Sequence, residues 1–172
     1  MQMRAVNHTR TEFRHWSIKC YLGGSEYAAK GASVTNACLS PDPIFGNWSA
    51  VSSSNYMYGS ELDSDVAGPG TETQDNTCAV CKSKVHSSSV MIPGRNECYS
   101  GWKKQYGGYL VTSPINYSPK ETICFNEHPD FIVGGGADNN GNLLYPIQAE
   151  CGSLECPPYV NGKLLTCVVC TK

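Results

Sequence analysis

The sequence predicts an all-β, disulfide-rich fold in which two tandem homologous β units pack as one compact domain. Three observations support this: the chain has ten cysteines in 172 residues, it is rich in Tyr, Gly, Ser and Asn, and no window shows the 3.6-residue apolar period of an amphipathic helix. A Cys-x-x-Cys motif also occurs twice, as Cys78-Ala-Val-Cys81 and as Cys167-Val-Val-Cys170, with an offset of 89 residues. This offset indicates an internal duplication.

Local patterns divide the chain into a leader and two units. Residues 1–12 are polar and without a pattern, so we expect a flexible leader there. The first β unit is expected over residues 13–90 and the second over residues 91–172. Alternating apolar residues and turn-forming boundaries predict short strands. These strands are expected at residues 13–20, 55–58, 88–93, 105–112 and 142–150, the last interrupted at Pro146, with a loop at 63–76.

Corresponding residues occur in the same order in both units. The matches are Cys20 with Cys98, Cys38 with Cys124, Tyr56-Met-Tyr58 with Leu143-Leu-Tyr145, and the two Cys-x-x-Cys motifs with each other. We therefore interpret the chain as a tandem repeat of two disulfide-bearing units.

Composition limits the cellular setting and the partners. The net charge of −2 provides no cationic surface, so we expect no nucleic-acid partner. No stretch approaches the roughly 20 apolar residues that span a bilayer, so we expect no membrane insertion. An even set of ten cysteines favours an extracellular location, and the glycosylation sequons at Asn7, Asn47 and Asn116 agree with secretion. No signal peptide is visible after Met1, so we expect a mature domain, a fragment or an incomplete gene model.

Four longer segments, together with Cys78-Ala-Val-Cys81, form a specific pattern. They are Cys38-Leu-x-x-Asp-Pro, Tyr56-Met-Tyr-Gly-Ser-Glu, Val90-Met-Ile-Pro-Gly-Arg-Asn-x-Cys98-Tyr-x-Gly-Trp102 and Cys151-Gly-Ser-Leu-x-Cys156-Pro-Pro-Tyr-Val-x-Gly-Lys-x-Leu-Thr-Cys167-Val-Val-Cys170. These segments resemble the C-terminal domain of invertebrate short-chain collagens, also called spongin-type collagens. The resemblance extends from about Phe13 to Lys172, although the chain has no Gly-X-Y repeats. That domain is similar in plan to the C-terminal non-collagenous domain of type IV collagen, which also has two β units.

The resemblance implies a disulfide pairing that the sequence alone cannot select. The resemblance to type IV collagen implies Cys98 with Cys170, Cys124 with Cys167 and Cys151 with Cys156, and the internal repeat then implies Cys20 with Cys81 and Cys38 with Cys78. Zinc binding and redox chemistry are the alternatives for the Cys-x-x-Cys motifs, and we favour structural disulfides because the residues between the cysteines suit strands.

Other candidate sites have simpler structural explanations. His128 lies between Glu127 and Asp130, a combination that suits acid–base chemistry, but a polar turn explains it better. The segment Asp138-Asn-Asn140-Gly141-Asn142 is interpreted as a type I′ hairpin turn rather than a calcium loop. We therefore expect no catalytic residue, no metal and no cofactor.

The expected function is that of a non-enzymatic extracellular matrix module that self-associates, as the resemblance implies. A symmetric homo-oligomer such as a trimer, or binding to other matrix proteins, is the expected mode of assembly. The alternative is a secreted lectin-like module that binds glycans or proteins through the loops at residues 63–76 and 112–120. Trp16, Trp48 and Trp102 could then belong to a binding surface, although packing against disulfides is the other explanation.

Overall fold

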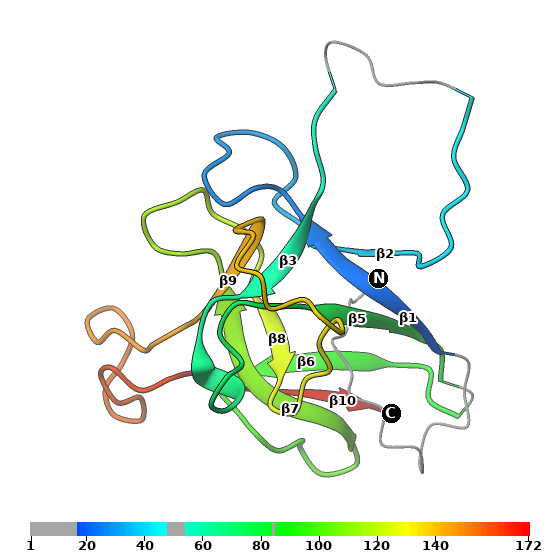
Figure 1. Cartoon of the computed structure of the whole chain (residues 1–172). Coiled ribbons are helices and arrows are strands. Elements are labelled where there is room, and N and C mark those ends of the chain that lie inside the picture. Colours follow the sequence, from blue (N-terminus) through cyan, green and yellow to red (C-terminus); the bar gives the residue numbers. More distant parts are fainter. Residues whose placement is uncertain (1–16, 48–53, 84) are drawn as a thin grey trace.

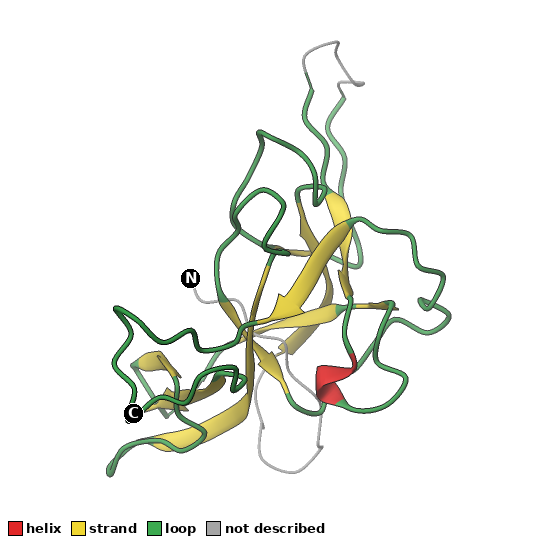
Figure 2. Ribbon diagram, turned by 90° about the vertical axis from the view of Figure 1, so that its left-hand side faces the viewer, coloured by secondary structure: helices red, strands yellow, loops and turns green. Residues whose placement is uncertain are grey.

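The structure is a computed structural model, and it describes residues 17–47, 54–83 and 85–172. Its described part is all-β, as predicted, and its only helical element is a three-residue 3-10 helix, η1 (Asp65–Ala67). Figure 2 shows strands and long connecting loops, with η1 in red. The strands are β1 (Ser17–Gly24), β2 (Ala37–Leu39), β3 (Tyr58–Leu62), β4 (Gln74–Asp75), β5 (Thr77–Cys81), β6 (Ser89–Pro93), β7 (Lys103–Thr112), β8 (Ile123–Asn126), β9 (Asn142–Pro146) and β10 (Thr166–Thr171).

One curled sheet contains all of these strands (Figure 1), and each half has one strand that pairs with three others. The strand β1 pairs with β2, β3 and β5, and β7 pairs with β8, β9 and β10, all antiparallel. The third strands of the two halves, β3 and β9, then pair with each other in parallel. This seam joins the halves into one sheet with the order β2-β1-β3-β9-β7-β10-β6.

Residues from both halves share the main hydrophobic core. Leu62 of β3 packs in one cluster with Val111 of β7, Phe125 of β8 and Leu144 of β9, all almost completely buried. A second cluster, around Tyr106 and Val169, belongs to the second half. Because a buried aliphatic or aromatic side chain contributes roughly 1.5–3 kcal/mol, the shared cluster alone holds the halves together strongly.

A buried polar network reinforces the seam. Asn142 donates from Nδ2 to Asn36 Oδ1 over 2.7 Å, and its own Oδ1 accepts from Lys120 Nζ over 2.6 Å. Lys120 also donates to the carbonyl of Ser25 over 2.8 Å. The backbone N–H of Asn36 in turn donates to Glu121 Oε1 over 2.5 Å. The Lys120 ammonium lies partly away from water, and this desolvation lowers its pKa.

Several expected strand boundaries differ from those in the structure. The strand expected at 55–58 begins only at Tyr58 and continues to Leu62, because residues 54–57 extend outward with exposed side chains. The strand β9 ends at Pro146, as proline cannot donate to a ladder. The expected strand at 13–20 is observed from Ser17, and residues 13–16 and the leader at 1–12 lie outside the described residues. The strand β6 spans the expected boundary between residues 90 and 91 and pairs with β10.

The strand β7 contains the pair Gly107-Gly108, and the close approach of β8 requires the second of these glycines. At Gly108 a β-carbon would collide with the carbonyl oxygen of Phe125, so only glycine allows β8 to approach this closely. The irregularity in the β7/β10 ladder lies elsewhere: Val169 is opposite Tyr106 while Cys170 is opposite Lys104, which leaves Gln105 as the extra residue of a bulge.

The expected type I′ turn is not formed. Such a turn needs positive φ at two successive residues. In the structure Asp138 and Asn140 have φ of 51° and 53°, and neither Asn139 nor Gly141, the two neighbours of Asn140, has a positive φ. The segment leads into β9, which pairs with β3 and β7 rather than with the strand before it.

Candidate functional site

Four disulfides cross-link the described part of the chain, and they coincide with four of the five expected pairs. The bonds Cys98–Cys170 and Cys124–Cys167 tie β10 to the start and the middle of the second half. The bond Cys38–Cys78 joins β2 to β5, which is the counterpart of the bond between β8 and β10. The bond Cys151–Cys156 joins two residues of one loop that are five positions apart in the sequence.

The fifth implied pair, Cys20 with Cys81, is incompatible with the strand register. Cys20 lies inside β1 opposite Cys78, and Cys81 lies opposite Ser17. An offset of three residues is about 10 Å along a strand, beyond the Cα separation of roughly 7 Å that a disulfide tolerates. The match of Cys20 with Cys98 is the source of the error. In the structure Cys98 precedes β7. Cys20 lies inside β1 opposite Cys78, and the residue opposite Cys167, the counterpart of Cys78, is Gly108 of β7. The structural counterpart of Cys20 is therefore Gly108 and not Cys98.

The Cys-x-x-Cys motifs lie in β5 and β10, and three of their four cysteines take part in disulfides with distant residues. The described residues contain no group of three or more His, Cys, Asp or Glu side chains that could hold a metal ion. The alternation of Asp138, Asn140 and Asn142 does not form a common site either. The side chain of Asn140 donates to Asp138 Oδ1, whereas Asn142 is turned into the buried network of the seam.

Of the described histidines and sequon asparagines, all are exposed except His86, which is half-buried. Asn47 and Asn116 are exposed, as attachment of a glycan would require. Asn7 lies outside the described residues, as do Trp16 and Trp48. His128 is exposed and its backbone N–H donates to Asn126 Oδ1, which is the geometry of a polar turn.

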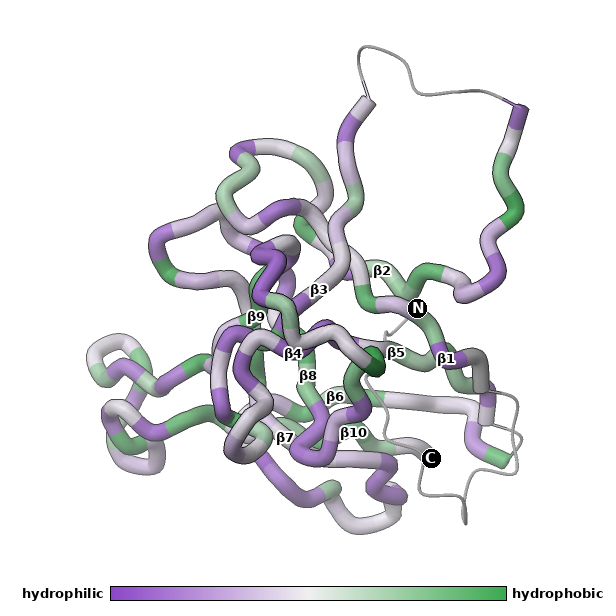
Figure 3. Tube along the Cα trace, viewed as in Figure 1, coloured by the Kyte–Doolittle hydropathy of each residue, from purple (hydrophilic) through white to green (hydrophobic). Residues whose placement is uncertain are grey.

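The most distinctive surface is apolar and lies at the first half. We call residues 40–47 and 54–57 the arm, because these two flanks run outward from β2 and β3 (Figure 1). Ile44 is 99% exposed, Phe45 85% and Tyr56 73%, and Met57 is also exposed. In Figure 3 the flank at residues 40–47 carries a green, hydrophobic stretch far from the core. Large apolar side chains concentrated in this way are typical of an interaction surface.

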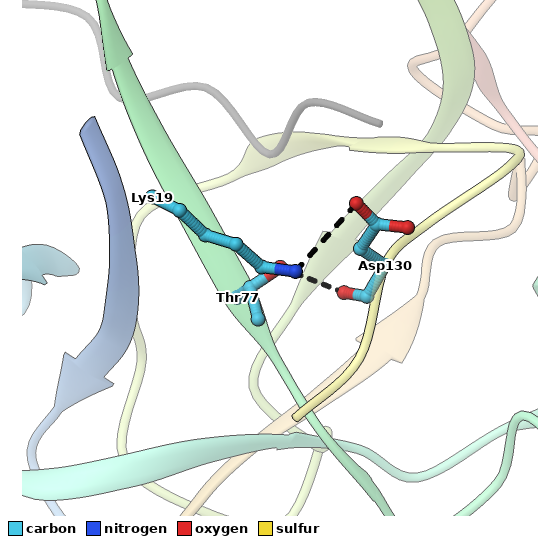
Figure 4. A network of polar contacts seen from close by, with 3 residues as sticks. All are labelled: Lys19, Thr77 and Asp130. Atoms are coloured by element: carbon cyan, nitrogen blue, oxygen red, sulfur yellow. Dashed lines mark hydrogen bonds and ion pairs between the residues drawn. The ribbon is translucent and has the colours of Figure 1, made fainter. Parts of the chain in front are cut away.

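A hollow of about 490 Å³ lies at the base of the arm. Its walls come from Tyr21 of β1, Pro41 of the arm and the segment 131–133, and most of the lining is apolar. At one side Lys19 Nζ lies 3.7 Å from Asp130 Oδ2, and Thr77 Oγ1 donates to the Asp130 carbonyl over 2.8 Å (Figure 4). These contacts fix the segment 131–133 against β1 and β5. The ion pair itself is largely exposed and contributes little to stability.

A second hollow of about 370 Å³ adjoins the first, because Tyr21 and Ile132 line both. It lies between β1, β2, β3 and residues 139–141, and we call it the carboxylate pocket, since Glu61 and Asp75 line it. Glu61 is 1% exposed. Its Oε2 accepts from the backbone N–H groups of Asn139 and Asn140 over 3.1 and 3.2 Å.

Both carboxyl groups of this pocket have altered acidity. Desolvation raises the pKa of Glu61, and the charges of Asp138 and Asp75 raise it further, while the two N–H donors oppose the shift. Desolvation also raises the pKa of Asp75. No pattern in the sequence indicates this pocket. Glu61 and Asp75 are distant in sequence and become neighbours only through the short β3/β4 pairing inside a segment expected to be a loop.

No helix in the described residues is long and apolar enough to cross a membrane. In comparisons with known proteins, no family model, no curated protein and no solved structure matches the chain.

Proposed function

We propose that the chain is a non-enzymatic extracellular matrix module that associates with copies of itself, as the resemblance to short-chain collagen C-terminal domains implies. In this role a homo-oligomer, such as a trimer, holds attached segments in register. The observation that carries the proposal is the exposure of large apolar side chains along the arm.

The chemistry of the arm suits another protein surface. Ile44 and Phe45 are neighbours in sequence and almost fully exposed, and Tyr56 and Met57 extend the apolar surface on the other flank. Removing such side chains from water contributes roughly 1.5–3 kcal/mol each. The small net charge of −2 leaves little electrostatic repulsion between two copies. A second copy of the chain is therefore a suitable occupant.

The location proposed for this module is outside the cell. Four disulfides are compatible with an oxidising compartment, and the exposed sequons at Asn47 and Asn116 support the same setting. Detection of the glycosylated full chain in the medium of secreting cells, and loss of one glycan in the variant Asn116→Gln, would test it.

Light scattering coupled to size-exclusion chromatography tests the self-association. We expect the full chain to form an oligomer, and the double variant Ile44→Ser/Phe45→Ser to be a monomer. Ile115→Ser is the matched control, because Ile115 is 97% exposed in the second half and away from the arm. A monomeric full chain at high concentration, or an arm variant that assembles like the control, would contradict the proposal.

The lectin-like alternative receives less support from its two loops. In the loop at 63–76, Asp65 Oδ1 accepts from the N–H groups of Thr71 and Glu72 over 3.0 and 3.1 Å. In the loop at 112–120, Ser118 and Lys120 donate to carbonyls of the first half. These polar groups already have partners within the molecule. A glycan array that identified a ligand, with binding lost on Asp65→Ala, would favour this alternative.

A further inference from the structure

The carboxylate pocket contains negative charge that no described residue neutralises. Glu61 Oε1 is buried and has no hydrogen-bond partner among the described residues. Asp75 lies directly opposite Glu61 in the β3/β4 ladder and lines the same pocket. The described lining residues include no lysine, arginine or histidine. A buried carboxylate without a cation or a full set of donors is costly, so a group that supplies donors and positive charge would fit here.

The walls of the pocket indicate what kind of cation fits. Most of the wall consists of aromatic and aliphatic side chains, namely Tyr21, Tyr58, Leu39 and Ile132. The two carboxyl groups, Glu61 and Asp75, are neighbours on adjacent strands of the same wall. A divalent metal ion prefers six or more oxygen ligands and gains nothing from apolar walls. A long side chain with an apolar stem and a cationic head uses both surfaces, and tyrosine faces also attract cations.

Arginine matches this arrangement better than lysine does. Its planar guanidinium has five N–H donors in a fixed fork, so one group can donate to Glu61 Oε1 and to the carboxylate of Asp75 together. Lysine has three donors on a compact head and stacks less well on aromatic rings. The volume of about 370 Å³ is ample for one such side chain.

We propose that the carboxylate pocket binds an arginine side chain of a partner protein, with its guanidinium between Glu61 and Asp75 and its stem against Tyr21 and Tyr58. This inference goes beyond the proposed self-association and does not depend on it, because the arm and the pocket are tested by different variants.

Two-dimensional ¹⁵N NMR of the full chain, titrated with N-acetyl-arginine amide, tests the proposal. We expect shifts at the amides of Asn139 and Asn140, because their N–H groups donate to Glu61 Oε2. The citrulline analogue has the same shape without the charge and should cause no shifts. The lysine analogue should bind several-fold more weakly.

Variants identify the groups responsible. Glu61→Gln should weaken arginine-amide binding at least tenfold, and Glu155→Gln, which alters an exposed carboxylate elsewhere, should not. If Glu61→Gln did not fold, Asp75→Asn would serve the same purpose. Three results would overturn the proposal: no shifts at the pocket with arginine amide, equal shifts with citrulline amide, or displacement of arginine amide by millimolar Ca²⁺ acting at the same amides.

Discussion

Replacing both Cys124 and Cys167 by alanine is expected to cost the protein at most about 4 kcal/mol of unfolding free energy through chain entropy. The bond closes a sequence separation of 43 residues. For a loop of this length the chain-entropy model gives about 4 kcal/mol at 25 °C. The Cys98–Cys170 bond encloses this loop and already shortens the path between the two cysteines, so the entropic figure is an upper bound. Both sulfurs are buried, and lost packing adds about 1 kcal/mol.

The double variant Cys151→Ala/Cys156→Ala is the matched control. Its bond closes a separation of only five residues, which corresponds to about 2 kcal/mol in the same model. Equilibrium unfolding in urea without reductant measures both values, and peptide mapping verifies that the other disulfides remain. The variant without the Cys124–Cys167 bond should also show the larger increase in m, the slope of unfolding free energy against urea concentration. The reason is that opening the larger loop lets the denatured chain expand more. Equal losses for the two variants, or a greater loss for the control, would refute the reasoning.

Three further changes probe the seam, the sheet and the carboxylate pocket. Lys120→Met should cost about 1–3 kcal/mol in urea unfolding, because it leaves two buried acceptors without their donor. Gly108→Ala should cost several kcal/mol, of the order of other severe steric changes, because the new methyl group forces β8 away from β7. Because the pKa of Glu61 is raised in the folded protein, the contribution of Glu61 to stability is greatest below 4.5, the value in the unfolded chain, and decreases as the pH rises through the higher folded value. Glu61→Gln should reduce this fall, and Asp75, whose pKa is also raised, should account for part of what remains.

Each of these changes has a control or a contradicting result. Gly59→Ala matches Gly108→Ala, since Gly59 is also in a strand but a β-carbon there meets open space, and its stability should change little. Lys163→Met alters an exposed lysine of the second half and should be almost neutral. Parallel curves of stability against pH for the native protein and Glu61→Gln would show that the Glu61 carboxyl does not contribute to the pH dependence.

The fold class could be predicted because composition and local pattern determine it. Ten cysteines, frequent turn residues and the absence of a helical period are properties of short windows, and the all-β class depends on little else. The placement of Cys20 could not be predicted in the same way. Matching it to Cys98 used the order of cysteines along the chain, whereas the ladder between β1 and β5 determines which residues face each other.

The carboxylate pocket shows a second limit of sequence reasoning. Glu61 was part of a motif segment and Asp75 lay in an expected loop, and neither belongs to a recognisable spacing. Their meeting depends on a two-residue strand, β4, and on the segment 139–141 that covers them. Likewise, the seam network around Asn142 depends on strands from different halves pairing in parallel, which no local pattern encodes.

The pairing of β3 with β9 has a consequence for any attempt to separate the halves. A fragment ending near residue 90 would expose β3 as an unprotected edge, and the complementary fragment would do the same with β9. Such edges recruit further strands, and each fragment would also uncover Leu62 or Leu144. Half-length pieces should therefore precipitate or exchange strands with one another, and co-expression of the two pieces should restore a soluble complex.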